Sequence, residues 1–313
     1  MRTPALRLAL FPLLASLAAC GDASARPGEA AVRDSAGVRI VESTEPAWGE
    51  GEGWRLSAEP LLDVGVADGD PAYQFGRVVG ALRLPDGTLV VADRQSRELR
   101  FFDRDGRHVR TAGGKGGGPG ELQSMHRLLR ARGDSVAVWD DQSSRLSLFS
   151  PRGDFVRSTT VEPERESLVL QAEGVFADGS LLVTPLFNWV FRPGTEEARD
   201  TAVYVRYSAE GAALDTLGRF PGTQTITVTG RENGGWALRG NVPFGLNTFR
   251  AVHGDRLYVA DNERYQVAVY DRAGALVQVV RAARQPQPLT PAEIESYKRD
   301  QLAMVGKGED RLM

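Results

Sequence analysis

The sequence is poor in the residues that build disulfides and metal centres. Its 313 residues include one cysteine, Cys20, so no disulfide can form within the chain and stability must come from packing. The three histidines, His108, His126 and His253, do not stand at the spacings of metal ligands, and we expect them on the surface or at strand ends. No G-x-S-x-G nucleophile elbow occurs, although the sequence leaves a Ser-His-Asp arrangement open. We therefore assign no catalytic, cofactor-binding or metal-binding residue.

A large excess of either charge is also missing, as is helical periodicity over most of the chain. The 38 Lys and Arg residues nearly balance the 41 Asp and Glu residues, which gives a formal net charge of −3. This mild acidity, without a basic stripe, argues against nucleic-acid binding. Because apolar residues do not recur at helical spacing before residue 290, we expect one all-β domain.

The first twenty residues, MRTPALRLALFPLLASLAAC, have the organisation of an export signal. Arg2 and Arg7 give a positive start, and the apolar run over residues 8–19 is too short to span a bilayer as a mature helix. The last four letters, LAAC, resemble the lipobox of bacterial lipoproteins, in which the cysteine is lipidated and becomes the new N-terminus. This resemblance implies a lipid on Cys20; the alternative is an ordinary secretory signal with a chance cysteine.

A lipid anchor would place the exported protein in the cell envelope. We predict that residues 1–19 are a lipoprotein signal peptide and that residues 20–33, rich in small and polar side chains, form a flexible tether. Acyl chains on Cys20 would hold the protein on a membrane. In bacterial lipoproteins an Asp after the cysteine commonly signals retention at the inner membrane. Gly21 therefore implies the outer membrane, with the protein facing the periplasm or the exterior.

Three stretches of the chain share one pattern. They are LPDGTLVVADRQSRELRFFDRDGRHVR (84–110), ARGDSVAVWDDQSSRLSLFSPRGDFVR (131–157) and VHGDRLYVADNERYQVAVYDRAGALVQ (252–278). In each, a turn leads into a short apolar run that ends in Asp, followed by a polar link, an alternating strand, a turn with Gly and another strand. A looser copy reads FADGSLLVTPLF and then AVYVRYSAEGAALDTL, with an insertion between its halves.

Each repeat predicts an antiparallel meander of three or four short strands. Alternation with a period of two makes one face of each strand apolar, and Asp-Gly or similar pairs supply the reversals. A lone meander would expose that apolar face, whereas copies packed side by side around an axis cover it. Repeats of 40 to 50 residues with four strands are typical of β-propeller blades, whereas the competing solenoid fold uses shorter or helical repeats.

The glycine-rich stretch AGGKGGGPGELQS, residues 112–124, has two interpretations: a phosphate-binding loop or a joint between blades. A Walker A loop needs Ser or Thr after its lysine and a helix beyond, but Gly116 follows Lys115 and another strand comes next. The dinucleotide-binding spacing fails at Pro119, where its third glycine would stand. We therefore predict a joint between two blades.

The phrases GGKGGGPGEL, VVAD, YVAD, FFDRDG and VYDRAG resemble NHL-type repeats and, more broadly, the six-bladed β-propellers of the TolB-like superfamily. The opening DSAGVRIVEST (34–44) is similar to the start of exported lipoproteins in that group. The resemblance covers roughly residues 34–305 and implies an all-β fold. It leaves function open, because such propellers serve as binding platforms, lyases and lactone hydrolases.

The chain has too few repeats for six full blades. We predict a β-propeller domain over residues 34–285 of the six-bladed type, incomplete, followed by a C-terminal helix and tail over 286–313. Thr290 and Glu293 form a capping-box pattern, Pro291 stands at the first helical position, and Gly306 is expected to end the helix. Either the ring has fewer blades, or it is truncated and open, with two unpaired sheet edges; we favour the second.

Aspartates recur at the end of each apolar run, at Asp93, Asp140 and Asp261. A ring of carboxylates in a central channel could bind calcium, but the repetition favours a structural role in which each Asp accepts backbone N–H bonds from the turn that follows. Trp139 lies in an apolar run and is expected in the core. Trp189 lies in the insertion, which either forms a binding face or packs on its own blade.

These observations favour a membrane-anchored binding platform without catalytic activity, whose ligand is a protein, a peptide or a glycan. The alternative is a calcium-dependent hydrolase or lyase with its site in the central channel. No cofactor is predicted, calcium being the one candidate.

Overall fold

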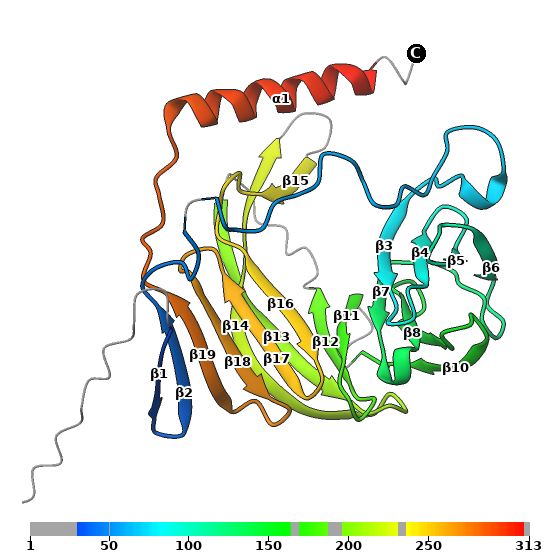
Figure 1. The fold of residues 1–313 in the computed structure, drawn as a ribbon, viewed down its shortest axis with the longest axis horizontal. Helices are drawn as coiled ribbons and strands as arrows, with labels where there is room; N and C mark the ends of the chain where they lie inside the picture. Colours follow the sequence, from blue (N-terminus) through cyan, green and yellow to red (C-terminus); the bar gives the residue numbers. More distant parts are fainter. Residues whose placement is uncertain (1–29, 50, 164–168, 187–195, 231–235, 310–313) are drawn as a thin grey trace, which may run out of the picture.

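A computed structural model describes residues 30–49, 51–163, 169–186, 196–230 and 236–309 (Figure 1). Cys20, the predicted signal peptide 1–19 and Trp189 lie outside these described residues. The described part is mostly β-strand, arranged in four sheets, with one C-terminal helix. The predicted all-β propeller architecture is confirmed.

Each sheet is a meander and forms one blade. In blade 1 the order is β3 (Val78–Arg83), β4 (Leu89–Asp93), β5 (Glu98–Phe102), β6 (His108–Gly113). In blade 2 it is β7 (Arg127–Arg130), β8 (Val136–Asp140), β9 (Arg145–Phe149), β10 (Phe155–Thr160). Blade 3 contains β11 (Val169–Val175), β12 (Leu181–Leu186), β13 (Glu196–Tyr207), β14 (Ala213–Gly230), β15 (Trp236–Asn241). Blade 4 contains β16 (Thr248–His253), β17 (Arg256–Asp261), β18 (Gln266–Asp271), β19 (Leu276–Ala282), then β2 (Val38–Ser43) and β1 (Ala31–Ser35).

The sequence repeats correspond to the second, third and fourth strands of each meander. The three close repeats become β4–β6, β8–β10 and β17–β19, and the looser copy becomes β12 to β14. The glycines predicted in the turns, Gly106, Gly153, Gly211 and Gly274, all have positive φ, between 79° and 96°. These reversals need a residue without a Cβ, because the left-handed region is strained for other side chains.

The blades pack face to face, and each contact between neighbouring blades has its own apolar core. The first core joins blades 1 and 2 through Phe101 and Phe149, the second joins blades 2 and 3 around Trp139, and the third joins blades 3 and 4 through Phe220 and Leu257. Trp139 is fully buried, as predicted, and its indole N–H donates to the carbonyl of Leu170 in blade 3 at 3.0 Å. The innermost strands β3, β7, β11 and β16 therefore lie next to one another in this order.

Four blades with three cores form an arc. Among the described residues, blades 1 and 4 share none of these cores, and Figure 1 shows their outer strands on opposite sides of the molecule. The described residues therefore form four blades, where the pattern that the sequence resembles has six. We expected an open ring to expose two unpaired sheet edges. Because blades pack against each other through their faces, an open arc instead leaves one blade face without a neighbouring blade at each end.

The free face of blade 1 is covered by residues 62–77, which we call the strap. No β-strand forms in the strap, although the predicted β-propeller domain of residues 34–285 includes it. The rings of Tyr73 and Phe75 pack on Phe102, with centroids 5.5 and 6.1 Å away. Leu62 lies against Gly106, where a Cβ would approach its Cδ1 to 2.7 Å. The strap thus replaces a neighbouring blade.

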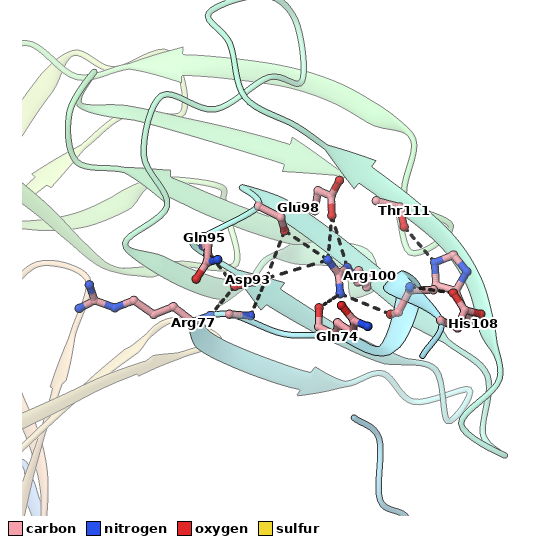
Figure 2. A network of polar contacts seen from close by, with 12 residues as sticks. Gln74, Arg77, Asp93, Gln95, Glu98, Arg100, His108 and Thr111 are labelled. Carbon is pink, nitrogen blue, oxygen red and sulfur yellow. Dashed lines mark hydrogen bonds and ion pairs between the residues drawn. The ribbon is translucent and has the colours of Figure 1, made fainter. Parts of the chain in front are cut away.

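Arg100 fastens the strap to blade 1 (Figure 2). The guanidinium of this buried residue donates to the carbonyl oxygens of Ala72 and Gln74 and stacks over the ring of Phe75 at 5.1 Å. It is held from the sheet side by Glu98 at 3.1 Å and Asp93 at 4.0 Å. Both carboxylates compensate the buried charge, so this network explains how a charged strand residue is tolerated under the strap.

The free face of blade 4 is apolar and partly exposed. Cross-strand pairing places Phe249 beside Ala260, Ala260 beside Val267, and Val267 beside Val280, so these side chains share one face of the sheet. Phe249 is 60% exposed. The two ends of the arc therefore differ, because only the blade 1 face has the strap.

The N-terminal hairpin completes blade 4. β1 and β2 turn through Ala36 and Gly37, and β2 pairs in parallel with β19, where Glu42 and Arg281 form an ion pair at 2.9 Å. β1 starts at Ala31, so the last residues of the predicted 20–33 tether belong to this hairpin. The pairing joins segments more than 200 residues apart.

The C-terminal helix α1 (Pro291–Glu309) starts as predicted. The backbone N–H of Thr290 donates to the carboxylate of Glu293, whose own N–H donates back to the threonine hydroxyl. The helix does not end at Gly306 but continues to Glu309, since one interior glycine costs only about 1 kcal/mol of helix stability. Within the described ranges, no helix is both long and apolar enough to cross a bilayer.

We expect Gly174→Ala to destabilise the protein. A Cβ at Gly174 on β11 would stand 2.4 Å from the Cβ of Val252 on β16, so the two inner strands must separate, at a cost of about 1–3 kcal/mol. Urea unfolding measures the loss. The control is Gly240→Ala, where a Cβ meets no atom within 4 Å. Equal stability of the two variants would contradict close packing of β11 on β16.

Candidate binding site on the inner strands

A β-bulge in β11 turns the Glu173 side chain toward the neighbouring inner strands β7 and β16. Ala172 pairs with Val183 and Gly174 pairs with Leu182, so Glu173 is the extra residue between two regular pairs. Bulges bend a strand locally and re-aim a side chain, and they are common next to functional sites. The glycine that follows lets β11 approach β16 closely. The bulge therefore brings one carboxylate to the point where three blades meet.

Arginines from both neighbouring inner strands bind this carboxylate. Arg127 on β7 pairs with Oε2 of Glu173, and Arg250 on β16 pairs with Oε1. The hydroxyl of Thr184 on β12 donates to Oε1 at 2.8 Å. The Glu173 side chain is 0% exposed, whereas Arg127 is 35% and Arg250 is 23% exposed. We call these three charged residues the charged cluster.

The charges in the cluster are permanent at neutral pH. Burial opposes ionisation of Glu173, but the hydrogen bond and charge of Arg250, the charge of Arg127 and the Thr184 hydroxyl outweigh it and hold the pKa of Glu173 below its ordinary value. Burial likewise works against the Arg250 charge, yet Glu173 raises the pKa of Arg250. The cluster is therefore a fixed array of one negative and two positive groups.

Arg250 is also positioned by an aromatic ring. Its guanidinium lies over the ring of Tyr204 on β13, with Cζ 5.9 Å from the centroid. Tyr204 is fully buried and packs on Phe220 in the core between blades 3 and 4. Cation–π contacts of this kind favour one orientation of the guanidinium.

His126, directly before β7, joins a second polar group. The amide nitrogen of Gln171 on β11 lies 2.7 Å from His126 Nε2, so Nε2 accepts and the proton belongs on Nδ1. Nδ1 faces Asp141 Oδ2 at 3.3 Å, and Arg94 approaches the same oxygen at 3.9 Å. Among the described residues no serine hydroxyl bonds His126; Ser124 pairs with Arg94 instead. This geometry does not form the Ser-His-Asp arrangement that the sequence left open.

The other two histidines lie at strand ends, as expected. His108 starts β6 and bonds Thr111, and His253 ends β16.

The repeated aspartates bind backbone N–H groups. Asp93 accepts from Gly76, Arg77 and Gln95; Asp140 accepts from Gln123, Gln142 and Ser143; Asp261 accepts from Glu263 and pairs with Arg199. Burial opposes ionisation of Asp93, but these N–H bonds outweigh it and lower the pKa of Asp93 (Figure 2). The predicted structural role is confirmed. Within the described ranges, no three His, Cys, Asp or Glu side chains converge to hold a metal ion.

The glycine-rich stretch is a joint between β6 and β7, as predicted. A side chain of the loop stabilises the loop itself, because the N–H of Gly118 donates to the Glu121 carboxylate at 2.9 Å. Arg145 of β9 donates to the carbonyl of Gly117 and fixes the loop on blade 2.

The sequence did not single out the charged cluster. Its members stand 46 and 77 residues apart, and each lies in an otherwise ordinary strand. The one local signal was the pair Glu173-Gly174, since a glycine inside a strand often marks a bulge or a close backbone approach.

No protein-family model matches the chain, and no curated protein matches it. Among solved structures it is similar to a protein from Bacteroides fragilis named as exported, at 13% identity and a TM-score of 0.43, over 78% of this chain. The chain spans only 60% of that protein. It is also similar to a chain of a nidogen–laminin complex (14%, TM-score 0.34, 67% and 86% covered) and to an inactive virginiamycin B lyase from Staphylococcus aureus (9%, TM-score 0.30, 60% and 80%). Similarities this distant do not bear on activity, and the fold assignment rests on the sheets and cores described above.

We expect Glu173→Gln to lower stability at pH 7 by about 3 kcal/mol, because two arginines lose their buried counter-charge. Since the folded-state pKa of Glu173 is lowered, its stabilisation is complete above about pH 4.3, the ordinary value, and fades as the pH falls below it. Urea unfolding between pH 7 and pH 3 should show the gap between wild type and variant closing. The exposed Glu210→Gln is the control. A gap that stays constant over this range would refute the assignment.

Proposed function

We propose that the protein is a lipid-anchored binding platform of the bacterial envelope that holds a protein, peptide or glycan ligand on its inner strands. The observation that supports this most directly is the charged cluster, in which two partly exposed arginines are fixed by one buried carboxylate at the junction of three blades. Strands hold such groups more rigidly than loops do, which suits recognition.

The protonation states of the cluster favour binding over acid–base chemistry. A general acid or base works best with a pKa near the operating pH. The pKa of Glu173 is lowered and that of Arg250 is raised, so each moves away from neutrality. Groups with fixed charges are suited to attract and orient a ligand.

The calcium-dependent hydrolase or lyase remains an alternative expectation from the sequence. The contacts described above do not favour it, because the carboxylates of Asp93 and Asp140 are engaged by backbone N–H groups.

The anchor is tested by the mass of the protein extracted from membranes. We expect a chain that lacks residues 1–19 and carries acyl groups on Cys20, because thioether-linked lipid is what the LAAC sequence implies. Cys20→Ala should leave the signal uncleaved or release the protein from the lipid phase. An unmodified Cys20 in the mature chain would refute the anchor.

The platform is tested by hydroxyl-radical footprinting of the full-length protein in its native envelope and after purification in detergent. We expect lower labelling in the envelope on the inner strands 127–130, 169–175 and 248–253, because a ligand there excludes solvent. The outer strands β6 and β10 serve as internal references. Equal labelling of the inner strands in both states would contradict a ligand at this face.

A further inference from the structure

We propose that the charged cluster recognises an anionic oxygen group of the ligand, a carboxylate or a phosphate. The proposal rests on the proposed function, since it specifies what the inner strands bind. It begins from the charge balance of the cluster: Arg127 and Arg250 carry two positive charges, and Glu173 carries one negative charge.

The exposed part of the cluster is positive, because its negative charge is hidden. Both Glu173 oxygens are engaged within the protein, Oε1 by Thr184 and Arg250 and Oε2 by Arg127, and the side chain is fully buried. The surface that an approaching ligand meets therefore consists of guanidinium groups. It offers N–H donors, and Glu173 presents no acceptor to solvent.

Several of these donors are uncommitted among the residues that the structure describes. A guanidinium carries five N–H groups in a planar fork. Arg127 directs its Nη1 at Glu173, and 35% of its side chain is exposed, so its remaining N–H groups form the accessible part of the cluster. Arg250 directs Nη2 at Glu173 and Nη1 at the carbonyl oxygen of Thr248 at 3.5 Å. Carboxylates and phosphates match the fork because they accept two parallel hydrogen bonds.

The arginines are held in place before the ligand arrives. Glu173 fixes both guanidiniums, and the Tyr204 ring supports that of Arg250. Side chains that are ordered in advance reduce the entropy lost on binding. Half-burial between two blades also strengthens an ion pair relative to one at an open surface.

The polar group beside the cluster does not cancel this attraction. Asp141 is the acidic residue of that group, and it faces Arg94 and His126. Gln171 adds an amide next to His126.

The test is thermal unfolding of the full-length protein in non-ionic detergent, with sodium phosphate or sodium succinate and with sodium chloride at equal ionic strength. We expect each binding anion to raise Tm with saturation, since a ligand that binds only the folded state stabilises it. Arg127→Gln should lose the rise. Arg127→Lys, which keeps the charge but lacks the fork, should need about tenfold more anion for the same rise.

The matched control is Arg110→Gln. Arg110 is 44% exposed and pairs with Asp154 across blades 1 and 2, so it resembles Arg127 in residue type and setting but lies outside the cluster. It should keep the full anion-dependent rise in Tm.

The anion used identifies the source. A saturable rise with phosphate alone assigns a phosphoryl group, one with succinate alone assigns a carboxylate, and one with both assigns their shared chemistry. No saturable rise with either anion, or an equal rise in Arg127→Gln, would overturn the proposal and leave the cluster as a structural tie between blades.

These outcomes are separable from those of the platform. Footprint protection of the inner strands without an anion effect would keep the platform and reject the anionic group. An anion effect without protection in the envelope would keep the anion site and reject the platform.

Discussion

The whole structure depends on the burial of one apolar blade face against the next. A meander of four strands has an apolar face that it cannot cover alone, and each of the three cores pairs the faces of two neighbouring blades. Where no blade follows, another element takes its place or the face stays open. On blade 1, Tyr73 and Phe75 of the strap pack on Phe102, and Arg100 holds the strap by hydrogen bonds to its backbone. On blade 4 Phe249 remains largely exposed.

Face-to-face packing also brings the inner strands together, and this proximity creates the charged cluster. Strands β7, β11 and β16 approach so closely that one carboxylate reaches an arginine on either side, and Gly174 is needed for the last contact. A buried carboxylate with both oxygens satisfied is tolerated, whereas removal of a partner leaves an uncompensated charge. The same geometry that links three blades leaves two guanidiniums partly open to solvent. The three residues that link these blades are therefore the same ones that we propose for ligand binding.

Two kinds of arginine illustrate how context assigns a role. Arg100 is buried, faces two carboxylates and donates hydrogen bonds to carbonyl oxygens of the strap. Its role is therefore structural. Arg127 and Arg250 share one carboxylate and keep part of their surface exposed. The two kinds of arginine differ in the ratio of positive to negative groups around them and in how far other residues cover them. The strand sequences do not reveal these differences, because each of the three arginines is simply a polar residue within an apolar run.

The amino-acid sequence is enough to predict the local structure: the meanders, their turn glycines, the turn-binding aspartates at Asp93 and Asp140, and the capping box at Thr290. Each depends on residues within a few positions of one another, through side-chain alternation and backbone conformation, so a short window carries the information. The tertiary structure alone decided the number of blades in the arc, the parallel pairing of β2 with β19, the strap over blade 1 and the meeting of Arg127, Glu173 and Arg250. These depend on which faces and inner strands become neighbours, and such contacts join residues from 26 to 239 positions apart.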